Sequence, residues 1–84
     1  MNYQRGTIVR SKAGHDKGSF YAVVAVNGDS ALVADGRKKT AAAPKCKKLI
    51  HLAFTKTVLS EQTMNDDSKI QKELEPFNKR VRAD

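Results

Sequence analysis

Six basic side chains lie within twelve residues of this chain, and no acidic residue stands between them. Lysine and arginine neutralise phosphate groups and release the counterions that surround a nucleic acid. We therefore expect these residues to form a phosphate-binding edge, although surface lysines also occur where they only maintain solubility. The six residues of this basic edge are Arg37, Lys38, Lys39, Lys45, Lys47 and Lys48.

A second basic group surrounds two glycines nearer the N-terminus, Gly14 and Gly18. A glycine-bearing loop lets the backbone approach a nucleic-acid strand, and His15 is able to stack on a base. The other interpretation is that the glycines only shape the turn and the charges are solvated. We expect Asp16 to bind the backbone of its own turn and not to act in catalysis. This loop group consists of Arg10, Lys12, His15 and Lys17.

The charge of the chain is distributed unevenly along its 84 residues. The net charge is +7, but residues 1–56 carry eleven Lys or Arg against three Asp, a balance of +8. Residues 57–84 carry five basic and six acidic residues, a balance of −1. A strongly basic segment favours nucleic acid or another polyanion as the partner. We expect that partner to face the first part of the chain and not its tail.

The composition argues against an enzyme. A chain of this length with five aromatic residues and no Trp has little room to enclose a small-molecule substrate. No spacing indicates a Ser-His-Asp arrangement, a phosphate loop or a carboxylate pair, and we expect no cofactor. Cys46, His15 and His51 do not supply the four closely spaced ligands of a structural zinc, so we expect no metal.

The sequence also suggests where the protein acts. A single cysteine excludes an internal disulfide and suits a reducing compartment. Polar residues 2–5 follow Met1, which predicts no signal peptide. No apolar run approaches the roughly 20 residues that span a bilayer. We therefore expect a cytoplasmic monomer without a membrane partner.

Two apolar runs flank the loop group in the sequence and are expected to hold it in place. Residues 6–10 are β-branched and apolar apart from their ends, and residues 20–26 are seven consecutive apolar or aromatic residues. Their length, their β-branched content and the turn residues at their ends favour strands. A continuous apolar run is typical of a strand with both faces buried, which predicts a further element on the outer face.

Turn residues divide the following segment into short strands. Asn27-Gly28 predicts a tight hairpin that leads into a strand at residues 31–33. Asp35-Gly36 predicts a second such turn, with residues 37–39 opening a fourth strand; Pro44 either ends that strand or lies at a sheet edge. Residues 47–52 are expected to form the last strand. Five short, closely spaced strands predict a small barrel.

The tail is predicted to be helical. Residues 54–63 are a polar connection, after which residues 67–75 form a helix that Pro76 ends or kinks. Its apolar face is expected to pack on the barrel; the alternative is a helix that orders only when it docks on a partner. The apolar face consists of Ile70, Leu74, Phe77 and Val81.

The aromatic residues have two possible uses. Phe20, Tyr21 and Phe54 could form a stacking platform for bases. Aromatic residues in a short barrel more often belong to the core, which we expect for Phe20 and Phe54. Tyr3 and Tyr21 are more open, because a tyrosine hydroxyl commonly reaches the surface.

The order of these features resembles a KOW motif. Gly6 is followed by a short apolar strand at Ile8-Val9, a loop that closes over residues 14–18, and a valine-rich strand at residues 23–26. The likeness continues through ALVADG at residues 31–36 and KCKKLIHL at residues 45–52, and it ends near Thr57. Over these segments the chain is similar to the single-KOW ribosomal proteins of archaea and eukaryotes, large-subunit proteins fourteen and twenty-seven, and to small bacterial KOW proteins that bind RNA.

This resemblance implies a mainly β fold. Residues 1–57 would form an SH3-like five-stranded barrel, and residues 58–84 a linker and a C-terminal helix that packs on it. The family binds RNA, often on the ribosome, so ribosomal RNA is the expected partner, with ribosomal proteins as further candidates. The alternative is an SH3-like protein-interaction module of the translation or transcription machinery. The basic edge favours RNA, because a protein-only binder has no need of six unopposed cations.

Overall fold

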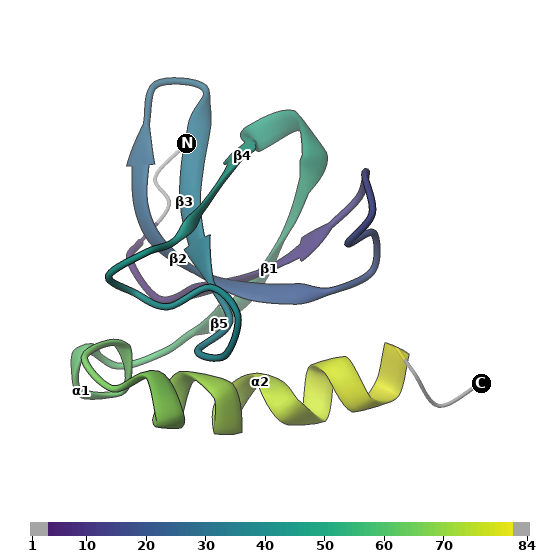
Figure 1. Ribbon diagram of the computed structural model, residues 1–84. Helices are drawn as coiled ribbons and strands as arrows, with labels where there is room; N and C mark the ends of the chain where they lie inside the picture. Colours follow the sequence, from purple (N-terminus) through teal and green to yellow (C-terminus); the bar gives the residue numbers. More distant parts are fainter. Residues whose placement is uncertain (1–3, 82–84) are drawn as a thin grey trace.

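The computed structural model describes residues 4–81, and the side chains of residues 4–78. Five strands form one antiparallel sheet in the order β4-β3-β2-β1-β5, followed by two helices (Figure 1). The mainly β prediction with a C-terminal helix is confirmed. The strands are β1 (Thr7–Ser11), β2 (Phe20–Asn27), β3 (Ser30–Ala34), β4 (Lys45–Lys48) and β5 (Leu52–Val58).

The sheet curls because two of its strand pairs are irregular. The register of β1 on β5 shifts between Thr7 and Val9, and that of β2 on β3 shifts between Val23 and Ala25. Such bulges bend a strand and increase its twist. In Figure 1 the long strand β2 is strongly bent, and it pairs with β1 on one side and with β3 on the other.

Strands β1 and β2 bury both of their faces at Ile8-Val9 and at residues 21–23, as the continuous apolar runs predicted, whereas Ala25 and Val26 at the end of the second run are exposed. Ile8 pairs with Ala22 and faces the helices, whereas Val9 pairs with Tyr21 and faces the inside of the curl. The helix-side cluster contains Ile8, Ala22, Leu59, Met64, Ile70 and Leu74. The inner cluster contains Val9, Tyr21, Val23, Ala31, Val33 and Leu52.

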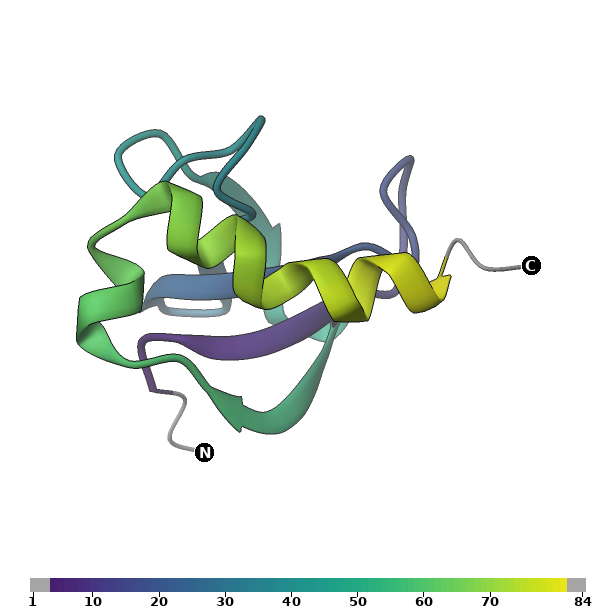
Figure 2. The same ribbon diagram turned by 90° about the horizontal axis from the view of Figure 1, so that it is seen from below.

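Helix α2 (Asp67–Val81) is the element that covers the outer face of the sheet, and α1 (Glu61–Met64) leads into it. Ile70 and Leu74 are 0% and 1% exposed in the helix-side cluster. Figure 2 shows α2 lying across the strands along most of its length. The side chain of Val81 lies outside the described residues.

Our expectation that the helix ends or kinks near Pro76 is wrong in its boundary, since α2 continues to Val81. Pro76 is exposed, and the carbonyl that loses its hydrogen bond belongs to Lys72, also on the exposed face. Water is able to satisfy that carbonyl. On the buried side, the Phe77 ring packs 5.2 Å from that of Phe20, and Asn78 Oδ1 accepts the Phe20 N–H at 2.9 Å. These contacts hold the last turns of the helix.

Two strand assignments from the sequence are also wrong. Residues 35–44 form turns and bends in place of a fourth strand, so β4 begins only at Lys45. A short 3-10 turn, η1 (Leu49–His51), then separates β4 from β5. Residues 52–58, largely assigned to a polar connection, form β5 because they pair with β1. Thr55 Oγ1 donates to the Ile8 carbonyl at 2.7 Å, a long-range contact that local pattern does not reveal.

Candidate functional site

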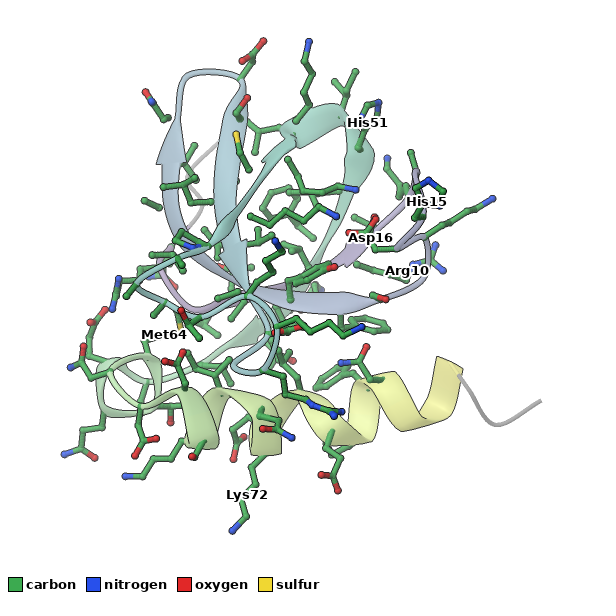
Figure 3. The ribbon with its side chains drawn as sticks, in the orientation of Figure 1. Arg10, His15, Asp16, His51, Met64 and Lys72 are labelled. Atoms are coloured by element: carbon green, nitrogen blue, oxygen red, sulfur yellow. The ribbon has the colours of Figure 1, made fainter. Side chains whose placement is uncertain are left out.

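An open groove of about 750 Å³ lies between α2, the start of β2 and the two loops that follow β1 and β3. Figure 3 shows His15 and Asp16 on the loop after β1, at the end of the molecule toward which the second half of α2 runs. The groove brings together members of both basic groups found in the sequence. It is lined by His15, Asp16, Ser19, Phe20, Tyr21, Asp35, Arg37, Lys38, Lys39, Lys45, Gln71, Glu75 and Asn78.

One wall of the groove carries three consecutive exposed cations, Arg37, Lys38 and Lys39. Asp35 shapes this cationic wall, because its Oδ1 accepts the backbone N–H groups of Arg37 at 2.8 Å and Lys39 at 3.0 Å. The carboxylate thereby replaces the strand pairing that the sequence predicted for this segment. A compact turn results, from which the three side chains project.

The cationic wall is held in place by contact with helix α2. The Ala41 N–H donates to Asp67 Oδ1 at 2.9 Å, which ties the loop to the first turn of the helix. Gly36 has φ of +80°, and a Cβ at this position would meet the Asp67 carbonyl oxygen and lie 2.8 Å from the Gln71 nitrogen. Only glycine allows this approach of two backbones. The cations therefore have a fixed position relative to the helix.

Asp16 is the centre of a hydrogen-bond network at the other side of the groove. Its Oδ1 accepts from Ser11 Oγ at 2.9 Å and from Lys47 Nζ at 2.9 Å. Its Oδ2 accepts from Tyr21 OH at 2.7 Å and from Lys45 Nζ at 2.8 Å. Our expectation that this side chain binds its own turn is wrong: the backbone bond of the turn runs from the Ser19 N–H to the Asp16 carbonyl.

The network shifts the pKa values of Asp16 and Tyr21 further from neutrality. Burial alone would raise the pKa of Asp16, but hydrogen bonds from Lys45, Tyr21, Lys47 and Ser11 outweigh it and hold that pKa far below its usual range. Burial and the hydrogen bond to Asp16 raise the pKa of the Tyr21 hydroxyl. The carboxylate is therefore ionised and the phenol neutral at physiological pH.

Two lysines of the basic edge are thus engaged inside the protein. The side chain of Lys47 is only 9% exposed, and its Nζ also donates to Ser11 Oγ and to the Ala13 carbonyl, each at 2.9 Å. Lys45 is 35% exposed and is paired with the same carboxylate. In the register of β4 on β3 these residues oppose Ala31 and Val33 of the inner cluster, which explains their inward direction. The surface available to a phosphate therefore excludes Lys47.

The remaining predicted residues are divided between the groove and its surroundings. His15 is exposed and lines the groove. Arg10, Lys12 and Lys17 are exposed but lie outside its lining. Lys48 is also exposed outside it, because it alternates with Lys47 along β4. The structure thus unites His15 with the cationic wall and Lys45.

The cations are also less isolated in space than in sequence. Three carboxylates, those of Asp16, Asp35 and Glu75, share the lining of the groove with its four basic residues. Asp16 and Asp35 come from segments outside residues 37–48, and Glu75 comes from α2. The description of the basic edge as unopposed is therefore wrong at the level of the fold.

Sequence reasoning missed the third wall of the groove, a polar stripe on helix α2. Gln71, Glu75 and Asn78 line the groove. They follow the inward-facing positions Ile70, Leu74 and Phe77 by one residue each, so they repeat with the same helical spacing. That offset was a usable signal. The spacing does not reveal which segment lies beside these residues, and only the fold shows that this edge of the helix lines the same groove as the cationic wall.

The aromatic residues divide between the core and the groove. Tyr21 is 5% exposed in the inner cluster, and Phe54 is half-buried against the same cluster. Phe20 is half-buried against the helix-side cluster and also lines the groove. The core interpretation thus describes Phe54, whereas Phe20 serves both the core and the groove. Tyr3 lies outside the described residues.

Among the described residues, no group of three or more His, Cys, Asp or Glu is arranged to hold a metal ion. Cys46 is exposed on β4, His15 is exposed on the loop after β1, and His51 is exposed in the η1 turn. Within residues 4–81, no helix combines the length and the apolar character that crossing a membrane requires. Neither the protein-family models nor the curated proteins give a match to this chain.

Proposed function

We propose that this protein binds RNA by placing the phosphate backbone against the cationic wall of the groove. The observation that carries the proposal is the fixed, outward display of Arg37, Lys38 and Lys39 along a groove of about 750 Å³. Phosphate contacts from Arg and Lys position a protein on nucleic acid without reading its sequence. Lys45 adds less positive potential than the cationic wall, because its Nζ is paired with Asp16 Oδ2 at 2.8 Å.

The loop after β1 extends the same surface. His15 stands on the lip of the groove, and Lys12 and Lys17 are exposed on the same loop. A strand that follows the cationic wall would meet these side chains next. Together the two loops offer about 3 to 5 phosphate contacts, the number that sets the salt dependence of binding.

The proposal includes the fold family and the cellular setting. We take the curled sheet as an SH3-like barrel of the KOW type, supported by its five short strands, by the return of β5 to β1, and by the two bulges that curl it. Ribosomal RNA is the proposed partner, in the cytoplasm, where the exposed thiol of Cys46 stays reduced. No catalytic step is part of the proposal.

A protein-interaction role is the second candidate. It is favoured by Ile50, whose side chain is 74% exposed at the η1 turn, well away from the cationic wall in sequence. Covering this side chain with a partner would remove apolar surface from water, which favours association. This candidate predicts binding that is insensitive to removal of the three cations.

The test measures RNA affinity against salt by fluorescence anisotropy with a structured ribosomal RNA fragment. Wild-type log affinity should fall against log salt with a slope of roughly −2 to −5. Replacement of Arg37, Lys38 and Lys39 by Ala should weaken binding and flatten the slope by about 2 to 3, near one unit per lost contact.

The matched control removes the same charge elsewhere. Lys56, Lys69 and Lys72 are exposed and lie outside the groove, so their replacement by Ala should change the slope much less. Equal effects of the two triple variants would show that net charge and not the cationic wall drives binding. Sedimentation of lysate at low and high salt then separates a stable ribosomal subunit from a loose associate.

A further inference from the structure

The polar stripe of α2 has hydrogen-bonding capacity that the described side chains do not use. Within the side chains of residues 4–78, those of Gln71 and Glu75 make no hydrogen bond or ion pair. Asn78 uses its Oδ1 to accept the Phe20 N–H, which leaves its amide N–H groups free of that contact. Three polar groups at helical spacing thus line the groove along α2, next to the docked loop after β3.

Among the three residues of the polar stripe, Glu75 says most about the ligand, because its carboxylate is charged. A site built only for phosphates gains nothing from a carboxylate in its lining, because the like charge repels the ligand. A ligand that carries anions on one side and N–H donors on the other satisfies both walls at once. A nucleotide has this character: its phosphate is anionic, and its base edge carries N–H donors.

The base must be unpaired for this arrangement to work. In a duplex the donor groups of the Watson–Crick edge are occupied, and the deep, narrow major groove of A-form RNA keeps side chains from the base edges. Single-stranded loops and bulges can turn their bases outward, so that side chains hydrogen-bond them. The groove is open and within the range of about 300–1,000 Å³ that proteins use for ligands, so it has room for a base as well as its phosphate.

We propose that Glu75 reads the base edge of a single-stranded RNA segment whose phosphates lie on the cationic wall. A carboxylate accepts two parallel hydrogen bonds, and among the four bases guanine presents two adjacent N–H donors on its Watson–Crick edge. Guanine is therefore the preferred base, and the amides of Gln71 and Asn78 flank it. This inference rests on the proposed function and adds base selectivity to it.

The test uses four RNA heptamers that differ only in the central base, UUUXUUU, with binding measured by fluorescence anisotropy at one salt concentration. A bidentate contact to a base discriminates against the wrong base by roughly tenfold or more. Wild-type protein should therefore bind the guanine heptamer about tenfold tighter than the uracil heptamer. Glu75→Gln should reduce this ratio to about two or less, because the amide offers one acceptor in place of two.

The ratio is the readout because it cancels the effect of net charge. Removing a negative charge raises the affinity for every heptamer by a common factor. The control is Glu73→Gln, which removes the same charge from an exposed position of α2 outside the groove and should keep the wild-type ratio. Both substitutions are on the surface, and their effect on stability should stay within about 0.5 kcal/mol.

Each alternative outcome has a distinct meaning. Equal binding of the four heptamers by wild-type protein overturns base reading while the phosphate-binding function stands. A guanine preference that survives Glu75→Gln also overturns it, because selectivity then arises elsewhere. Absence of binding to all heptamers and to the structured fragment overturns the proposed function itself.

Discussion

Replacing Asp16 by Asn should destabilise this protein more than any other single loss of charge in its described residues. The carboxylate is 13% exposed and accepts hydrogen bonds from two lysines, a serine and a tyrosine. Its neutralisation leaves the ammonium of Lys47, 9% exposed, without a counter-charge. Breaking a buried ion pair by removing one partner costs about 3–5 kcal/mol. We expect the lower end, about 3 kcal/mol, because Lys47 Nζ keeps Ser11 Oγ and the Ala13 carbonyl as acceptors.

The assay is urea unfolding at pH 7, followed by circular dichroism. Asp29→Asn is the control, because that carboxylate is exposed, and it should change the free energy of unfolding by no more than about 0.5 kcal/mol. The double variant Asp16→Asn with Lys47→Met removes the stranded charge and keeps an unbranched apolar stem beside Ala31. It should recover at least half of the lost stability.

The pH dependence supplies an independent check. The pKa of Asp16 is lowered in the folded state from its ordinary value of 3.8. The unfolded state therefore binds a proton at this carboxylate more readily than the folded state does. The contribution of Asp16 is therefore present in full above about pH 5 and is lost as the pH falls towards the folded pKa. The difference in stability between wild type and Asp16→Asn should shrink over that range.

Two results would refute the reasoning. One is a loss below about 1 kcal/mol for Asp16→Asn at pH 7, which would mean that Lys47 reaches water. The other is a double variant no more stable than the single one, which would mean that the stranded charge is not the cause. Either result would return Lys47 to the surface that is available to RNA.

Three further predictions concern stability measured by the same unfolding assay. Leu74→Ala should cost about 2–5 kcal/mol because Leu74 is buried under the sheet, whereas exposed Lys72→Ala should change little; similar values would mean that α2 does not hold the sheet. Gly36→Ala should cost well above the roughly 1–2 kcal/mol expected of Gly28→Ala, since both glycines have positive φ but only Gly36 has backbone in the way of a Cβ. Tyr21→Phe should cost about 1.5–3 kcal/mol at pH 7 through its lost hydrogen bond to a carboxylate. The raised pKa of Tyr21 favours the folded state up to about pH 10 and less above it, so the difference between wild type and Tyr21→Phe should shrink at higher pH, and a constant difference would contradict this.

The sequence by itself determined the elements whose signals are local. The apolar runs at residues 6–10 and 20–26 contain most of β1 and most of β2, and Asn27-Gly28 leads into β3. The period of Ile70 and Leu74 predicted which side of α2 is buried. These predictions succeed because side-chain alternation and helical spacing depend only on residues that are close together in the sequence.

The sequence also indicated its basic groups, but not which cations are available. Lys45, Lys47 and Lys48 look alike along the chain. In the fold, β4 pairs with β3 so that Lys45 and Lys47 face the inner cluster, where Asp16 from a distant loop pairs with both. The direction of a side chain in an edge strand depends on its register, and that register is set by a partner strand.

Tertiary structure alone decided the remaining features of the candidate site. Residues 35–44 became a docked loop because Asp35 and Asp67 satisfy its backbone N–H groups, and Gly36 lets the loop touch α2. β5 formed because β1 offered it an edge. The docking of this loop on α2 brings the cationic wall and Glu75 into the same groove. Segments remote in sequence meet only when the core is packed, and the groove exists only where they meet.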